Sequence, residues 1–366
     1  MLAKLLFKAY ENEVTLDKRF KTLFEGSIIQ PLTNIPNFKT MKLVALKEQY
    51  GIFFSLSIFI ATIFMPFYIV IQCFYSFFTI LFTKKIKASR AIVIVPITSE
   101  RIPFIKEVIN SKADVINLSI NTLSRHLTLI DYFKCLKEVI QLTFLFFGKS
   151  EVAKSDLILH CHDCVKFLLF CRYVQNNPQC NYVTDDHYQR WAFLLTHLSN
   201  NTSIVQHGFL DDGIEFPHKF GKIKIIYLRN ETFFKLFSVY YNTFNFEVFK
   251  RILNTTEVSN VKKGVFLASS FPRINEEIEL LEAIRKHSSL PIIIKLHPRH
   301  SYSMEKKTLL LSYASYVCKR DEFPLCTIFI SYNSYLEYEY KDLEIFTFSI
   351  EKDNLSKLLS KLLAKE

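Results

Sequence analysis

The stretch AIVIVPI, residues 91–97, decides the fold class of this chain. It is a short β-branched run followed by an amphipathic stretch, and this alternation continues along the chain, as is typical of parallel α/β construction. Further strands are expected at 114–119, 156–160, 203–206 and 224–228, with helices at 130–147 and 188–198. These segments predict a first Rossmann-like lobe.

A polar stretch, NTTEVSNVKK at residues 254–263, precedes a second series of the same kind. Its strands are expected at 264–268, 291–296, 327–331 and 343–348, and its helices at 275–287 and 354–364. A chain of 366 residues is long enough for two such lobes and an appendage. We therefore expect an α/β protein with an N-terminal region at 1–89, one lobe at 90–255 and another at 256–366, the two lobes facing a cleft.

Residues 51–83 contain no charged side chain, and this run is longer than the roughly 20 residues that cross a bilayer. Basic residues lie on both sides of it, which favours both ends staying in the cytoplasm. Because Pro66 near the middle can break a helix, we expect a helical hairpin in the membrane interface. A single span and a buried helix pair in a soluble protein are the alternatives.

The positive charge is concentrated near this segment. The net charge is +11, and residues 1–90 carry 12 Lys or Arg against 5 Asp or Glu. Charge that flanks the most apolar segment favours anionic lipid head groups as partners, whereas nucleic-acid binders carry a basic stripe within a folded domain. Eight cysteines in a long chain without signal-peptide features predict reduced thiols. The expected location is thus the cytoplasmic face of a membrane.

Three polar clusters each follow a predicted strand directly, where parallel sheets bind their ligands. They are Gln206-His207-Gly208 with Asp211-Asp212-Gly213, then Lys295-Leu296-His297-Pro298-Arg299, and finally Ser331-Tyr332-Asn333-Ser334 with Glu337. Taken singly, Asp-Asp-Gly is an ordinary turn and the last cluster resembles a helix capping box. Their shared position after strands favours a functional site.

The clusters fit the needs of sugar transfer from a nucleotide donor, which requires a base, stabilisation of the leaving phosphate and contacts to the ribose. Asp211 and Asp212 crowd two like charges, which raises one pKa toward that of a useful base; Asp212 is the first choice. His207 beside them joins the catalytic set without an assigned role. The expected phosphate ligands are His297, Lys295, Arg299, Ser331, Asn333 and Ser334, and Glu337 is expected to accept from the ribose.

The motifs QHG, KLHPR and SYNS with a downstream Glu resemble those of the bacterial capsule and lipopolysaccharide transferases of GT-B type, over about residues 156–348. That group includes Kdo transferases, sialyltransferase-like enzymes and teichoic-acid glycerophosphotransferases. For members that use CMP-sugars, the resemblance implies a base at Asp211 or Asp212 and phosphate contacts from His297, Ser331 and Ser334. The chain departs from their pattern where Pro324 is followed by Leu325 and not by Glu, and where Asn333 splits the Ser pair.

We therefore expect a metal-independent, inverting glycosyltransferase that uses a CMP- or UDP-sugar and a lipid-linked or growing surface glycan. No Asp-x-Asp occurs, so no metal or other cofactor is expected. A zinc site in His160-Cys161-His162-Asp163-Cys164 is disfavoured because no second ligand pair follows at finger spacing. Thr184-Asp185-Asp186-His187 is interpreted as a helix N-cap region, with a position in the lining of the cleft as the alternative. The rival functions are a CDP-alditol phosphotransferase and a non-catalytic membrane component of a polysaccharide assembly complex.

Overall fold

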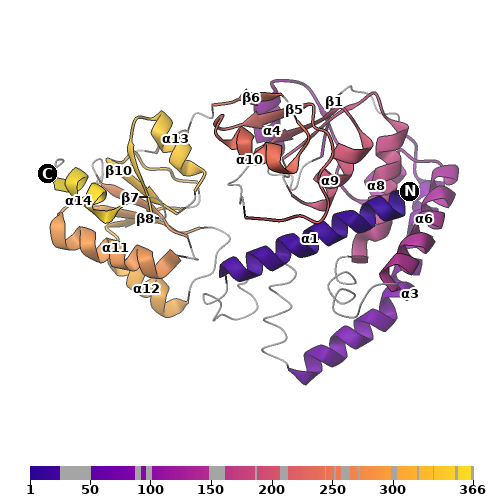
Figure 1. Ribbon diagram of the computed structural model, residues 1–366, viewed down its shortest axis with the longest axis horizontal. Coiled ribbons are helices and arrows are strands. Elements are labelled where there is room, and N and C mark those ends of the chain that lie inside the picture. The colour runs from indigo at the N-terminus through magenta and orange to yellow at the C-terminus, as the bar shows by residue number, and fades with distance from the viewer. Residues whose placement is uncertain are drawn as a thin grey trace. The chain divides into compact units, whose positions relative to one another are not determined.

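The computed structural model describes most of the chain in two compact units (Figure 1). The first unit holds Met1–Phe20 and the described residues from 51 to Phe249, and the second holds Lys21–Phe24 and the described residues from Lys250 onward. This division lies slightly before the predicted boundary after residue 255. The described residues are 1–24, 51–86, 92–95, 101–147, 161–185, 188–206, 213–243, 245–250, 253–256, 264–270, 273–297, 303–319, 321–332, 334–350 and 353–363.

The first unit contains a parallel six-stranded sheet in the order β2-β1-β3-β4-β5-β6. The expected strand at 156–160 lies outside the described residues, and β3 and β6 were not predicted. In chain order the elements are α1 (Leu2–Phe24), α3 (Ile52–Phe82), β1 (Ile92–Ile94), α4 (Ile102–Ile109), β2 (Asp114–Val115), α5 (Ile120–Ser124), α6 (Leu129–Phe147), η3 (Cys161–Asp163), α8 (Cys164–Asn176), β3 (Asn181–Thr184), α9 (Arg190–Leu198), β4 (Thr202–Val205), β5 (Ile225–Leu228), α10 (Phe233–Tyr240) and β6 (Phe246–Val248).

Residues Leu2–Phe20 of the N-terminal helix α1 belong to this unit. Its spacing of apolar residues buries Leu2, Leu6 and Tyr10 on one face. The rings of Phe7 and Tyr10 lie 5.6 and 5.8 Å from that of Phe146 on α6. Since tertiary packing supplies most of a helix's stability, this buried face fixes α1 against the lobe.

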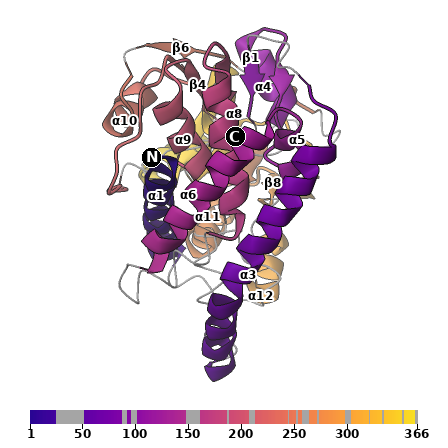
Figure 2. The ribbon, with the colours of Figure 1, turned by 90° about the vertical axis from the view of Figure 1, so that its right-hand side faces the viewer.

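The uncharged segment forms one continuous helix, α3, so the expected hairpin is wrong (Figure 2). Pro66 lies inside the helix, where it removes one backbone hydrogen bond. The helical segment on both sides of it includes no Gly, Asn or Asp, residues that favour a turn, so nothing local reverses the chain. After Pro66 the helix buries Ile69, Cys73 and Ile80 along one stripe, and it packs against α5, α6 and α8.

The second unit contains a parallel five-stranded sheet in the order β11-β10-β7-β8-β9. Both units are thus α/β with parallel sheets, as predicted, and their strand orders are compatible with Rossmann-like lobes. The elements are β7 (Val265–Ala268), α11 (Ile274–His287), β8 (Ile292–Lys295), α12 (Met304–Ser312), β9 (Tyr316–Val317), β10 (Ile328–Ser331), α13 (Leu336–Asp342), β11 (Phe346–Ser349) and α14 (Leu355–Leu363).

The two faces of the second sheet carry separate cores, because side chains alternate along a strand. One face buries residues such as Leu267, Ile294 and Ile330 together with side chains of α11, α12 and α14. The other buries Phe266, Ile293 and Phe329 with Tyr340 of α13, whose ring stacks on that of Phe329 at 4.4 Å. The face covered by α13 therefore has the smaller core, and this face extends to the polar residues at the carboxyl ends of the strands.

Candidate functional site

The carboxyl edge of the second sheet is the candidate site. The chain runs from β7 outward through β8 and β9, then crosses to the other side of β7 to form β10 and β11. The order therefore reverses between β7 and β10, which is where open parallel sheets bind ligands. The strand register places Ala268, Lys295, Ser331 and Ser349 side by side at this edge.

Three of these residues extend the α13 face of the sheet. Phe266, Ile293 and Phe329 lie on that face, and Ala268, Lys295 and Ser331 follow two residues later on the same strands. Because the side-chain period of a strand is two, Lys295 and Ser331 project to the side that α13 covers.

Ser331 and Glu337 end in buried polar atoms that no described group satisfies. Both side chains are buried. The Ser331 hydroxyl and the Glu337 Oε2 atom have no hydrogen-bond partner among the residues that the structure describes, while Glu337 Oε1 accepts from Lys341 Nζ at 2.5 Å. Buried polar groups are nearly always paired, so two such atoms near a strand-order reversal point to a missing ligand.

Lys295 reaches the same edge, but its ammonium group is already engaged. Nζ donates to the Glu322 backbone carbonyl at 2.6 Å and lies 3.5 Å from the centre of the Phe323 ring. Burial lowers the pKa of Lys295, although the charges of Cys318, Asp321 and Glu322 act in the opposite direction. Glu322 orders the loop between β9 and β10, because its carboxylate accepts from Tyr316 Oη and Lys319 N, each at 2.9 Å.

Arg273 was missed by the sequence analysis and lies beside the reversal point. Its guanidinium carbon is 4.9 Å from the centre of the Tyr332 ring, which joins the segment after β7 to the segment after β10. Nη1 donates to Glu276 Oε1 at 2.7 Å, and hydrogen bonds to Glu276 and Tyr332 raise the pKa of Arg273. The Arg273 side chain is 40% exposed, so its guanidinium has room for a second anionic partner. Its only sequence signal is an Arg five residues after a predicted strand.

Glu277 was also missed, and it fixes the segment that follows β7. Its Oε2 accepts from the Ser269 hydroxyl at 2.5 Å, and its Oε1 accepts from the Ser270 backbone N–H at 2.6 Å. Burial raises the pKa of Glu277 to about 8, against the lowering effect of these two hydrogen bonds. The side chain thus holds the loop without adding a full charge at neutral pH.

The other predicted residues of this lobe are placed in part. His297 is exposed, two residues beyond the end of β8. Ser334 Oγ accepts from Leu336 N at 3.3 Å, so it helps to begin α13. Arg299 and Asn333 lie outside the described residues.

In the first unit, the predicted bases also lie outside the described residues: His207, Asp211 and Asp212. The described neighbour Gln206 is buried at the end of β4, where its Oε1 accepts from Arg229 N at 3.0 Å and thereby ties β4 to β5. This gives the first residue of the Gln-His-Gly motif a structural role.

The N-cap interpretation of residues 184–187 is wrong for the part that is described. Thr184 ends β3 and Asp185 follows it, both buried. The N-cap residue of α9 is Gln189, because the helix begins only at Arg190. Asp185 therefore lies at the carboxyl end of a strand next to β1, at the order reversal of the first sheet.

The Cys- and His-rich segment at η3 is engaged in other contacts. Asp163 pairs with Arg190 at 2.5 Å and with Lys166 at 3.2 Å, and burial raises the pKa of Cys164. Within the described ranges no group of three or more His, Cys, Asp and Glu side chains is arranged to hold a metal. All eight cysteines are free thiols.

No model of a known protein family matches the chain, and its sequence matches no curated protein.

Proposed function

We propose that this protein is a GT-B glycosyltransferase that moves a sugar from a CMP- or UDP-sugar to a lipid-linked or growing surface polysaccharide of capsule or lipopolysaccharide type. The observation that carries the proposal is the pair of unsatisfied buried atoms, Ser331 Oγ and Glu337 Oε2, beside the reversal between β7 and β10. Nucleotides bind to parallel sheets at such positions.

The second unit supplies the donor site in this proposal. The Ser331 hydroxyl donates to a phosphate oxygen, and Arg273, whose side chain is partly exposed, adds a charge-assisted contact. Glu337 Oε2 accepts from a ribose hydroxyl. His297, Arg299, Asn333 and Ser334 complete the phosphate contacts, while Lys295 holds the β9–β10 loop and adds positive potential.

The first unit supplies the base. Asp212, or Asp211 beside it, removes the proton of the acceptor hydroxyl, and His207 lies next to this pair in the sequence. The acceptor oxygen attacks the anomeric carbon, and the bond from that carbon to the phosphate oxygen breaks. The nucleotide leaves with the bonding electrons, and the cations of the donor site stabilise its added charge. Attack opposite the leaving group inverts the anomeric centre.

A membrane location at the cytoplasmic face of the bacterial inner membrane is part of the proposal. Residues Ile63–Phe82 of α3 are long and apolar enough to cross a bilayer, and only 22% of them are buried within the protein. A largely exposed apolar helix lowers its free energy by entering lipid.

The donor site can be tested by deleting the Ser331 hydroxyl. Ser331→Ala removes a group without a described partner, so we expect no loss of thermal stability. Affinity for the nucleotide should fall about tenfold or more, since a hydrogen bond to a charged group contributes roughly 1.5–3 kcal/mol. The measurement is a thermal-shift titration with CMP, CDP, UDP and GDP.

Ser349→Ala is the matched control, because the Ser349 hydroxyl is likewise buried at the carboxyl edge without a partner among the described residues, but it lies one strand further from the reversal. Its nucleotide affinity should stay at the wild-type value. The proposal fails if no nucleotide stabilises the protein. A protein that releases CMP from CDP-glycerol but not from a CMP-sugar is a phosphotransferase and contradicts sugar transfer.

A further inference from the structure

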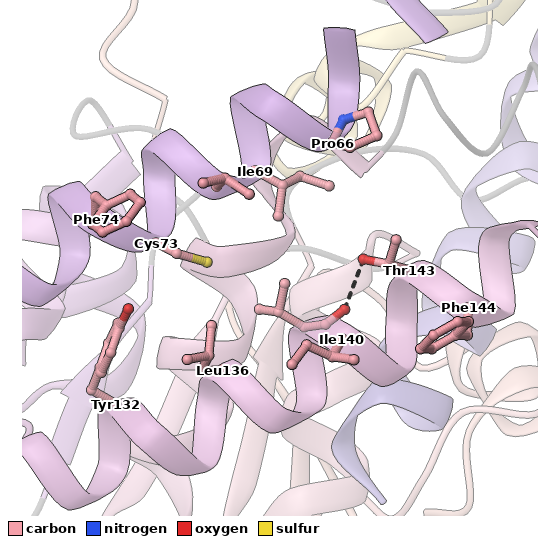
Figure 3. A pocket seen from close by; sticks show the side chains of 11 residues that line it. Pro66, Ile69, Cys73, Phe74, Tyr132, Leu136, Ile140, Thr143 and Phe144 are labelled. Atoms are coloured by element: carbon pink, nitrogen blue, oxygen red, sulfur yellow. Dashed lines mark hydrogen bonds between the residues drawn. The ribbon is translucent and has the colours of Figure 1, made fainter. Parts of the chain in front are cut away.

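An apolar pocket lies between α3 and α6 of the first unit, away from the sheet edges. Its volume is about 420 Å³, which is within the range of small-molecule sites. Figure 3 shows Ile69 and Cys73 projecting from α3, and Leu136 and Ile140 projecting from α6, into the space between the helices. Pro66 closes one part of the rim.

The pocket wall favours a ligand without polar groups. No charged side chain lines it, and its side chains with a polar atom are those of Cys73, Tyr132 and Thr143. The Thr143 hydroxyl donates to the Val139 backbone carbonyl at 2.9 Å, so it has no need of a ligand (Figure 3). Burying a polar group here without a partner would be costly, whereas a hydrocarbon chain gains from leaving water.

The pocket continues into an exposed apolar surface on the same two helices. On α3, Ile63 and Phe64 just before Pro66 and Phe67 just after it are exposed. On α6, Ile140 and Phe144 are exposed and also line the pocket. Before Pro66, no side chain of α3 that the structure describes is buried. A hydrocarbon chain can therefore pass from a bilayer to the pocket along apolar surface only.

A positive charge stands next to this surface. Lys137 is exposed on α6, three residues before Ile140, so the two side chains are neighbours on one helix face. An anionic head group complements this charge.

We propose that the pocket holds one hydrocarbon chain of a phosphate-headed membrane lipid, with Lys137 beside the head group. The inference rests on the membrane location within the proposed function and is independent of the transfer chemistry. A second copy of this chain is the less suitable occupant, because its α3 would bring the lysines that follow that helix, Lys84 and Lys85, toward Lys137, a charge of the same sign.

The test is photo-crosslinking in phosphatidylcholine vesicles that contain phosphatidylglycerol with a diazirine on one acyl chain. Mass spectrometry of the wild-type protein should place crosslinks on pocket residues such as Ile69, Cys73 and Leu136. Crosslinks confined to outward side chains such as Phe64 and Phe67, or a crosslinked protein dimer without lipid, would overturn the proposal.

Variants of α6 separate capture in the pocket from general contact with lipid. Leu136→Trp narrows the pocket between α3 and α6 and should reduce crosslinking at Ile69 and Cys73 by about tenfold or more, the effect of losing roughly two buried methylene contacts. Phe133→Trp is the control, because Phe133 is exposed on the same helix and does not line the pocket. Equal yields for the two variants contradict the proposal.

The head-group contact has its own pair of variants. Lys137→Gln should lower the preference for phosphatidylglycerol over a diazirine-labelled phosphatidylcholine, while Lys134→Gln, one turn further from Ile140 on the same helix, should keep it. Vesicle flotation of every variant reports membrane binding separately. If the wild-type protein does not float with the vesicles, the membrane location is refuted. If it floats but shows no crosslinks in the pocket, only the lipid site is refuted.

Discussion

Glu13→Gln should destabilise the first unit strongly, because Glu13 neutralises a buried arginine. Arg190 Nη2 lies 2.6 Å from Glu13 Oε2, Nε donates to Oε1 at 2.9 Å, and the Arg190 backbone N–H donates to the same Oε1 at 3.1 Å. The guanidinium also lies 4.9 Å from the ring centres of Tyr10 and Phe167. Although burial favours the neutral form, Glu13 and Asp163 hold the pKa of Arg190 above its usual range.

The expected cost follows from the partners that remain. Breaking a buried ion pair costs about 3–5 kcal/mol, and Asp163 still pairs with Arg190 at 2.5 Å, so the loss should be about 3 kcal/mol. For a unit of this size the midpoint of thermal unfolding should fall by about 6–12 °C. The single tryptophan, Trp191, stacks on Phe167 beside Arg190, so its fluorescence reports this unit.

Glu11→Gln is the matched control on the same helix. Its side chain is 24% exposed, compared with 8% for Glu13, and it pairs with His218 Nε2 at 2.7 Å. A partly exposed pair contributes at most about 1 kcal/mol. If the two variants unfold within 2 °C of each other, about the effect of 1 kcal/mol, then the Arg190 network does not fix α1 and the reasoning is wrong.

The remaining stability predictions concern one residue in each unit. Burial raises the pKa of Glu277 from 4.5 to about 8, so the folded state keeps a proton that the unfolded chain releases, and stability falls as pH rises from about 4.5 to 8. The free energy of unfolding in urea should fall by about 4 kcal/mol between pH 5 and pH 8.5 in the wild-type protein, and Glu277→Gln should remove this fall. A variant whose free energy of unfolding depends on pH as strongly as that of the wild type would contradict the assigned pKa. Gly221→Ala places a methyl group 2.1 Å from the Thr196 carbonyl oxygen, so it should cost about 2–3 kcal/mol by Trp191 fluorescence in urea. If Gly221→Ala unfolds at the same urea midpoint as the wild type, this close backbone contact is absent.

Strands with strong local patterns could be predicted from the sequence. Residues 264–268, 291–296 and 327–331 are apolar runs between polar stretches, and they form β7, β8 and β10 within one or two residues of the expected bounds. The strand expected at 343–348 begins only at Phe346. The reason is a left-handed turn at Glu344, with φ of 60°, which reverses the chain after α13.

Features that depend on distant partners could not be predicted. The strand β3 has the sequence NYVT, which is short and polar at its ends, and its pairing with β1 and β4 stabilises it. Helix α1 contains apolar spacing, but its burial depends on α6 and on Arg190, which are more than 100 residues away. Propensity is a weak guide where such tertiary contacts decide the outcome.

The candidate site divides in the same way. Its strand-end position was visible in the sequence, because polar residues follow apolar strands at Lys295 and Ser331. Arg273 and Glu277 were missed because their importance arises from the reversal of strand order between β7 and β10, which no local pattern encodes. The hydrogen bond from Ser269 to Glu277 spans eight residues across a loop and a helix start.

The most direct test of the central claim is hydrogen–deuterium exchange of the full-length protein with and without the nucleotide that stabilises it most. The claim predicts slower exchange in the backbone after β7 and β10, at residues 268–270 and 331–337, and a smaller effect in Ser331→Ala. Protection confined to the carboxyl edge of the first sheet, near Asp185 and Gln206, or no protection at saturating nucleotide, would contradict a donor site in the second unit.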